Sequence, residues 1–269
     1  MRLLLHAHSK IVIPPEAGFA LWLYPKYSNF QFHDLNSFLD DMGGTKKINN
    51  WNLDWDELKL FLRKVKPLSY NSLINSIYLY YARSISKPVE RWGDKNNFYL
   101  NYICEIKELF PNACFIHIIR DGRNVACSYK ELSKKQFTSP EAPNLPNNII
   151  EIAKEWSKNI SLINNSFKQF NYENVIESRL EDLTSKPKET ISKLMHFLEE
   201  DFETQMFEYY KINEKNGMEP PHYLGWKEKN TKPIQNESSE KFRTELTKEE
   251  IDYFNFYAKS NLIKYNYPL

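Results

Sequence analysis

An arginine and a serine stand eight positions apart where an apolar segment gives way to a turn. Residues 115–119 read Phe-Ile-His-Ile-Ile, which predicts a buried β-strand. Arg120 follows this strand, Gly122 permits a turn, and the segment that carries Ser128 can form a helix. This layout puts a guanidinium and a hydroxyl at the C-terminal edge of a sheet, beside a helix start, where a dianionic phosphate is bound well. The alternative is structural, with Arg120 in a salt bridge to Asp121 and Ser128 capping a helix.

Two further segments hold a charged side chain on a constrained backbone. Lys95 follows Gly93 and Asp94, and a glycine there lets the backbone approach a ligand while the lysine offers a compact positive charge. Glu16 follows a short predicted strand and two prolines that stiffen its backbone. The alternatives are a solvated surface turn at Lys95 and an ordinary exposed glutamate at position 16.

Composition narrows the class of protein. The chain of 269 residues is long enough for one large α/β domain or two small ones, and its 41% hydrophobic content excludes a disordered chain. A formal net charge of +1 gives no general attraction to nucleic acid or to an anionic membrane, and no apolar run is long enough to span a bilayer. Three cysteines without metal-ligand spacing are read as reduced thiols, two of them packed in the core, in a cytoplasmic protein.

Hydrophobic spacing and capping residues predict short strands that alternate with longer helices. This order favours an α/β fold with a parallel sheet covered on both faces, in a single domain over residues 1–269. Helices are expected at residues 1–8, after Asp54, from Ser69, over 97–109, from 149 to 167, after Ser185 and after Thr247; strands are expected at 11–13, 115–119 and 174–177; and a loop is expected over 132–148.

Three of these segments resemble parts of sulfotransferases that use 3′-phosphoadenosine-5′-phosphosulfate (PAPS). The strand with Arg120 and Ser128 resembles the family's 3′-phosphate-binding element, in which both side chains hold that phosphate. The segment Gly93-Asp94-Lys95-Asn96-Asn97 resembles the Gly-Asp-Lys-Thr-Pro segment, whose lysine lies near the transferring sulfuryl group, although two asparagines replace Thr-Pro. The segment that ends at Glu16 is similar to the region after the phosphosulfate loop in bacterial-type and tyrosylprotein sulfotransferases, in which the glutamate is the base on the acceptor hydroxyl.

Two more segments are similar to the same family. Residues 175–183 resemble its Arg-Tyr-Glu-Asp-Leu segment, with Leu180 in place of the tyrosine, and have a chiefly structural role there. Lys232-Pro233-Ile234 is similar to a loop that closes over the nucleotide, which makes Lys232 a candidate phosphate contact; the alternative is a mobile surface lysine. Each match is partial, but the five occur in the family's order along the chain.

The resemblance implies a P-loop-NTPase-like parallel sheet flanked by helices and the transfer of a sulfuryl group from PAPS without a metal. The acceptor would be a hydroxyl or amine of an unidentified carbohydrate, peptide tyrosine or small molecule, in a pocket shaped by residues 132–148 and 22–55. Glu16 and Lys95 would be catalytic, while Arg120, Ser128 and Lys232 would bind the donor.

The family's first strand and its Arg/Lys-Ser-Gly-Thr-Thr loop, which cradles the 5′-phosphosulfate, have no counterpart in this sequence. Transfer by this chain is therefore expected to be poor compared with a form that starts further upstream. The first alternative is a non-catalytic protein or fragment that binds 3′-phosphoadenosine nucleotides. The second is a P-loop kinase-like phosphotransferase, for which no glycine-rich Lys-Ser/Thr loop is present.

Overall fold

The computed structural model describes residues 1–87, 89, 91–137, 139, 141–235 and 240–269. The chain forms two compact units, each made of two stretches of sequence. The first unit contains Met1–Tyr99 and Glu203–Pro233, and the second contains Leu100–Phe202 and Ile234–Leu269. The single domain expected over residues 1–269 stays a prediction.

The first unit is largely helical and is built around one short strand pair. Strand β1 (Ile11–Val12) pairs in parallel with β2 (Arg91–Trp92), with Ile11 opposite Arg91. The α-helices are α1 (Arg2–His6), α2 (Phe19–Trp22), α3 (Tyr24–Tyr27), α4 (Leu35–Gly43), α5 (Trp55–Val65), α6 (Tyr70–Ser84), α12 (Tyr209–Asn216) and α13 (Leu224–Lys227). The 3-10 helices are η1 (Phe32–Asp34), η2 (Ile48–Trp51), η4 (Thr204–Glu208), η5 (Pro221–Tyr223) and η6 (Glu228–Thr231).

Local signals set the helix starts of this unit as predicted. The Asp54 carboxylate accepts a hydrogen bond from the Glu57 amide at the start of α5, and Ser69 caps α6. The buried face of α6 packs on an aromatic core in which the ring of Trp51 contacts both Phe19 and Tyr78 edge to face. The Trp51 indole also donates to the carbonyl of Pro15, 2.8 Å away, and so fixes the chain just before Glu16.

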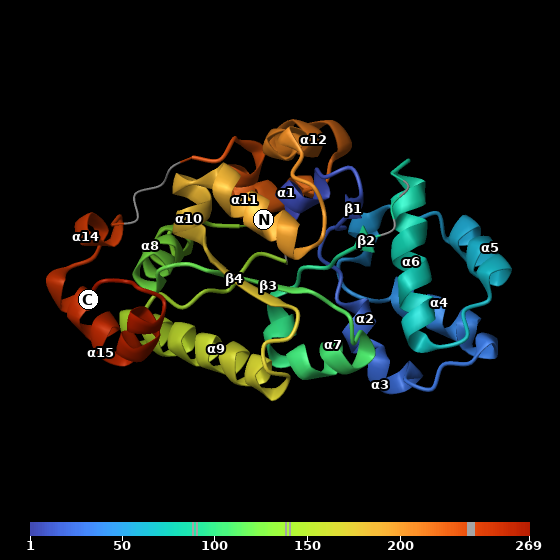
Figure 1. The fold of residues 1–269 in the computed structure, drawn as a ribbon, viewed down its shortest axis with the longest axis horizontal. Coiled ribbons are helices and arrows are strands. Elements are labelled where there is room, and N and C mark those ends of the chain that lie inside the picture. The colour runs from blue at the N-terminus through green and yellow to red at the C-terminus, as the bar shows by residue number, and fades with distance from the viewer. Residues whose placement is uncertain (88, 90, 138, 140, 236–239) are drawn as a thin grey trace. The chain divides into compact units, whose positions relative to one another are not determined.

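The second unit contains the other strand pair. Strand β3 (Phe115–Ile119) pairs in parallel with β4 (Val175–Arg179), and Ile119 lies opposite Arg179. The view in Figure 1 has α10 and α11 on one side of this pair, and α7 and α9 on the other. The helices of the unit are α7 (Ile103–Leu109), α8 (Gly122–Ser133), α9 (Ile149–Gln169), α10 (Leu180–Ser185), α11 (Pro187–Phe197), α14 (Phe242–Glu245) and α15 (Lys248–Lys264).

Helix α15 completes the core of the second unit by packing along α9. A capping box between Thr247 and Glu250 starts α15, as the sequence predicts. Its buried residues Phe254, Ala258 and Leu262 belong to the same apolar cluster as Ile152 and Ile160 of α9. The Asn261 amide adds a hydrogen bond to a backbone carbonyl of α9 at 2.9 Å.

The α/β class with small parallel sheets flanked by helices is confirmed. In the described residues the strands form two separate pairs, and the P-loop-like arrangement and the missing first strand stay predictions. The helix expected over residues 97–109 is interrupted, because a 3-10 helix, η3 (Asn97–Asn101), precedes α7 and Tyr102 is not helical. Residues 138 and 140 of the expected loop lie outside the described residues.

The expected cap at Ser185 is wrong. The Ser185 hydroxyl donates to the Glu181 carbonyl within α10, and α11 begins instead at Pro187. A proline suits the first position of a helix because its fixed φ is helical and it has no amide hydrogen to leave unpaired.

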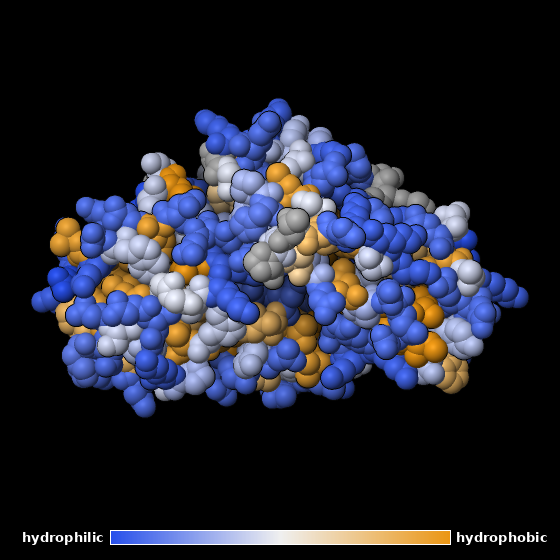
Figure 2. Space-filling model, turned by 180° about the vertical axis from the view of Figure 1, so that it is seen from behind, coloured by the Kyte–Doolittle hydropathy of each residue, from blue (hydrophilic) through white to orange (hydrophobic). Residues whose placement is uncertain are grey.

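The cysteines and the surface differ in part from expectation. Cys127 is buried, but Cys104 is half-buried and Cys114 is exposed, so one thiol rather than two is packed in the core. On the face drawn in Figure 2, hydrophilic residues surround separate hydrophobic patches. In the part of the chain that the structure describes, no helix combines the length and hydrophobicity needed to cross a membrane. A cytoplasmic location stays a prediction.

The packing of Gly122 gives a test of the second unit. A Cβ atom at this position would lie 2.5 Å from a Phe254 ring carbon and 2.6 Å from a Trp156 ring carbon. We expect Gly122→Ala to lower the free energy of unfolding by about 1–3 kcal/mol through overpacking, measured by urea denaturation. The control Gly43→Ala, whose Cβ would meet Trp55 at an ordinary 3.7 Å, should change it far less. Equal losses in both variants would contradict this account of the packing.

Candidate functional site

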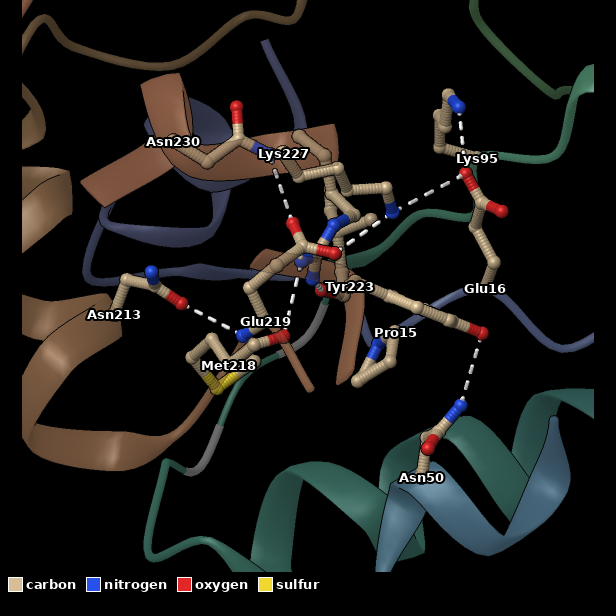
Figure 3. Close-up of polar contacts among 12 residues, drawn as sticks. Pro15, Glu16, Asn50, Lys95, Asn213, Met218, Glu219, Tyr223, Lys227 and Asn230 are labelled. Carbon is tan, nitrogen blue, oxygen red and sulfur yellow. Dashed lines mark hydrogen bonds and ion pairs between the residues drawn. The ribbon is translucent and has the colours of Figure 1, made fainter. Parts of the chain in front are cut away.

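Glu16 is a buried carboxylate that faces three lysines, two of which, Lys95 and Lys227, are drawn in Figure 3. Its Oε1 atom lies 2.6 Å from the Lys95 ammonium and 3.9 Å from the Lys227 ammonium. Its Oε2 atom lies 3.1 Å from the Lys47 ammonium. Only 9% of Glu16 is exposed, so the alternative of an ordinary exposed glutamate is wrong.

A second buried carboxylate, Glu219, orients Lys227. Its side chain is 2% exposed and accepts from the Lys227 ammonium at 2.7 Å and the Arg2 guanidinium at 3.0 Å. The Asn230 amide donates to it as well, and its own backbone amide donates to Asn213, as Figure 3 shows. Lys227 therefore lies between two carboxylates and has contacts with both.

The turn that carries Lys95 is held by a half-buried aspartate. Asp94 accepts hydrogen bonds from the hydroxyls of Tyr78 and Tyr99 and from the Lys95 amide. Burial raises the pKa of Asp94, and the two tyrosine hydrogen bonds oppose that rise. The Gly93 amide donates to Val12 of β1 at 2.8 Å, so this turn is attached to the strand that leads to Glu16.

The lysines dominate the electrostatics of Glu16. Burial alone raises the pKa of this carboxyl, but the lysines outweigh burial and lower the pKa to about 2. The pKa of Glu219 is also lowered, because Arg2 and Lys227 outweigh its burial. Glu16 is therefore ionised at neutral pH, and it accepts a proton readily only after its lysine contacts are weakened.

The second unit holds the arginine and serine at the end of β3. Arg120 follows the last residue of the strand, and its guanidinium donates to the Ser128 hydroxyl at 2.9 Å. Ser128 lies within α8 and donates in turn to the Asn124 carbonyl. The Trp156 indole donates to the Arg120 carbonyl at 3.2 Å. The structure thus brings Arg120 and Ser128 together, and it brings Glu16 and Lys95 together in the other unit.

Asp121 has its own partner and caps α8. Its carboxylate accepts from the Arg123 amide and is held by the buried Arg123 guanidinium at 2.7 Å. That guanidinium also stacks on the Phe242 ring, with its carbon 4.0 Å from the ring centroid. The alternative in which Ser128 caps a helix is wrong, since Asp121 is the cap and Ser128 lies inside the helix.

Arg179 is a second guanidinium at the same sheet edge, which sequence reasoning missed. It ends β4 directly opposite Ile119, one residue before Arg120. Its Nε is buried and has no hydrogen-bond partner among the described residues; a Glu181 carboxylate oxygen lies 3.9 Å away. Its place at a strand end is the signal that the sequence offers, although the family resemblance implies a chiefly structural role for this segment.

Lys232 forms a surface ion pair. Its ammonium lies 2.6 Å from a Glu228 carboxylate oxygen, and half of its side chain is exposed. Its carbonyl accepts from the Tyr209 hydroxyl. The described residues contain no group of three or more histidine, cysteine or acidic side chains that could hold a metal ion, and a metal-free reaction stays a prediction.

Lys47 and Lys227 were also missed by sequence reasoning. Lys47 lies 31 positions after Glu16 in a segment without a recognisable motif. Lys227 is separated from Glu16 by most of the chain. Their proximity is produced by the fold, and no local pattern in the sequence indicates it.

The low pKa of Glu16 predicts how stability depends on pH. The ordinary value is 4.5 and the folded-state value about 2, so the contribution of ionised Glu16 is complete above pH 4.5 and is lost as the pH falls from 4.5 through 2. We expect Glu16→Gln to lower the free energy of unfolding at pH 7 by up to about 3 kcal/mol, and by less at pH 3. Urea denaturation at several pH values measures both differences.

A matched control is Glu208→Gln, which removes an exposed glutamate that pairs with Lys211 at 3.0 Å. This variant should differ little from the wild type at any pH. A Glu16→Gln deficit of the same size at pH 7 and pH 3 would contradict the assigned pKa shift.

The comparisons with known proteins point to sulfotransferases. The model of the sulfotransferase family matches residues 1–204. A sulfotransferase domain from the curacin biosynthetic pathway superposes with a TM-score of 0.59 at 18% identity, covering 100% of this chain and 93% of that domain. The sulfotransferase domain of the Synechococcus PCC 7002 olefin synthase superposes with a TM-score of 0.56 at 18% identity. This match covers 96% of this chain and 88% of that domain.

These likenesses to solved structures show the fold alone, and no curated protein sequence matches. The family match spans more than half of the chain. The chain therefore belongs to the sulfotransferase family.

Proposed function

We propose that this protein transfers a sulfuryl group from PAPS to a hydroxyl or amine of an acceptor. Membership of the family supports sulfuryl transfer in general. The observation that carries the proposal is the contact of Lys95 with Glu16 at 2.6 Å, because it places a cation and a carboxylate at one point. Group transfer of this kind needs both, one to stabilise developing charge and one to take the acceptor's proton.

Donor binding is assigned to the edge of the β3–β4 pair. Arg120 and Ser128 would hold the 3′-phosphate, since they offer adjacent guanidinium and hydroxyl donors. Arg179 would add a second guanidinium there, which would give its buried Nε a partner. Lys232 would exchange its exposed ion pair with Glu228 for a phosphate oxygen.

The proposed reaction is an in-line displacement at sulfur. The bond from sulfur to the bridging oxygen of the donor breaks as a new bond forms between sulfur and the acceptor atom. Glu16 takes the proton of that atom, and Lys95 stabilises negative charge on the departing oxygen, which leaves as adenosine 3′,5′-bisphosphate. Positioning and electrostatic stabilisation supply most of the rate enhancement in the related phosphoryl transfers.

The low pKa of Glu16 requires a step before proton transfer. A carboxylate with a pKa of about 2 is a weak base at neutral pH. When the sulfuryl group draws the Lys95 ammonium toward itself, Glu16 loses its shortest ion pair and its pKa rises. Donor binding would therefore activate the base.

A non-catalytic protein that binds 3′-phosphoadenosine nucleotides is the second candidate. The observation in its favour is the same low pKa, since a permanently paired Glu16 would leave the site without a base. The two candidates differ in turnover: the second predicts nucleotide binding without sulfate transfer.

Replacing Arg120 tests the donor assignment. We expect wild-type protein to bind adenosine 3′,5′-bisphosphate more tightly than 5′-AMP in calorimetry. Arg120→Met should lower the affinity for the bisphosphate roughly tenfold to hundredfold, since hydrogen bonds to charged groups contribute about 1.5–3 kcal/mol. Its effect on 5′-AMP should be small.

Arg63→Met is the control, because it removes an exposed arginine of α5. It should leave both affinities unchanged. Equal binding of the two nucleotides by the wild type, or equal losses for both in Arg120→Met, would overturn the donor assignment.

A further inference from the structure

The cluster around Glu16 has more cations than carboxylates. Two buried carboxylates contact four cationic side chains, which leaves a surplus of two positive charges (4 − 2 = 2). The nearby Asp94 is held by two tyrosine hydroxyls and a backbone amide. The contacts within the cluster are those of Arg2, Lys47, Lys95 and Lys227 with Glu16 and Glu219.

The two oxygens of Glu16 face different cations. Lys95 and Lys227 lie toward Oε1, whereas Lys47 lies toward Oε2. Lys227 is balanced by its shorter contact with Glu219, at 2.7 Å. Lys47 and Lys95 both contact Glu16, so these two lysines share the charge of one carboxylate.

Lys47 is held in place by its surroundings. Its backbone has φ 68°, a left-handed conformation that a lysine rarely adopts, at the start of η2. Its ammonium lies 5.7 Å from the centroid of the Tyr223 ring, and the Lys227 ammonium lies 4.5 Å from the same centroid. The Asn50 amide, also from η2, donates to the Tyr223 hydroxyl at 3.2 Å, as Figure 3 shows.

Lys47 nevertheless remains accessible. About a quarter of its side chain (26%) is exposed, compared with 10% of the Glu16 side chain. A ligand that reaches Glu16 can therefore contact the Lys47 ammonium as well. Its distance of 3.1 Å from Oε2 puts any group bound by Lys47 within a few ångströms of the carboxylate.

The proposed reaction as described so far gives Lys47 no role. An acceptor that binds its ammonium would give it one. Movement of Lys95 toward the sulfuryl group removes one cation from Glu16, but Lys47 stays on the other oxygen and keeps the pKa of Glu16 low. A second anion that takes up the Lys47 ammonium would weaken the hold on the carboxylate further, because Lys227, which then remains, lies 3.9 Å away and is paired with Glu219 at 2.7 Å. The donor's sulfuryl group is already assigned to Lys95 and its 3′-phosphate to Arg120 and Ser128, so the acceptor is the candidate source of this second anion.

We propose that the acceptor is anionic, with a carboxylate or equivalent oxyanion that binds Lys47 beside the hydroxyl or amine to be sulfated. This inference rests on the proposed sulfuryl transfer and narrows its acceptor to one chemical class. Lys47 thus selects the acceptor and positions its reacting group toward Glu16.

The test uses pairs of model acceptors that differ in one charge: 4-hydroxyphenylacetate and its amide, glucuronate and glucuronamide, and 3-hydroxyoctanoate and its amide. Binding of each is measured by calorimetry with saturating adenosine 3′,5′-bisphosphate present. We expect the acid of at least one pair to bind about tenfold more tightly than its amide, as for a hydrogen bond to a charged group.

Lys47→Gln should abolish that preference, because it should lower the affinity for the acid about tenfold and the affinity for the amide less than twofold. Lys47→Arg should restore most of the preference. The control Lys211→Gln removes an exposed lysine paired with Glu208 and should keep the preference. Circular dichroism and binding of the bisphosphate show that each variant is folded.

Two results would overturn the inference. The first is that the wild type prefers the acid in none of the pairs, which includes the case in which no acid binds. The second is that Lys47→Gln lowers the affinities for acid and amide equally. Either result alongside tight binding of the bisphosphate rejects the anionic acceptor alone. Failure of the wild type to prefer the bisphosphate over 5′-AMP rejects the donor assignment instead, so the two failures are distinguishable.

Discussion

The site depends on one physical constraint: a buried carboxylate stays charged only where cations or hydrogen-bond donors compensate it, and Glu16 has three ammonium groups within 4 Å. Each supporting feature fixes one of these charges. The Trp51 indole holds the backbone before Glu16, Asp94 holds the turn of Lys95, and Glu219 holds Lys227. Removal of the central negative charge would leave lysines facing one another in a partly dry environment, which is unfavourable.

The two units contribute different chemistry. The first presents a carboxylate among ammonium groups, an arrangement suited to moving a proton while stabilising a departing oxygen. The second presents Arg120 and Ser128 at the end of a parallel strand pair, an arrangement suited to gripping a phosphate. Under the proposed function, the second unit would bind the nucleotide and set its position, and the lysine cluster of the first unit would control the basicity of Glu16.

Sequence reasoning succeeded where a short stretch of chain determines the outcome. The caps at Asp54 and Thr247, the strand before Arg120 and the eight-residue step to Ser128 are all local, because helix and strand geometry fix such spacings. It failed where the fold brings distant residues together. Lys47 is placed beside Glu16 by tertiary structure, and no local pattern reveals its role. Arg179 stands at a strand end, which is a local signal, but only the strand register places it beside Arg120.

The most direct measurement of the central claim is an NMR titration of the Glu16 side-chain carboxyl, assigned by its loss in Glu16→Gln. In the free protein we predict a pKa of about 2. With a non-transferable PAPS analogue and a bound anionic acceptor, we predict a clear rise in that pKa as Lys95 and Lys47 turn to the ligands. A free-protein pKa near the ordinary 4.5, or one that the ligands leave unchanged, would contradict the account.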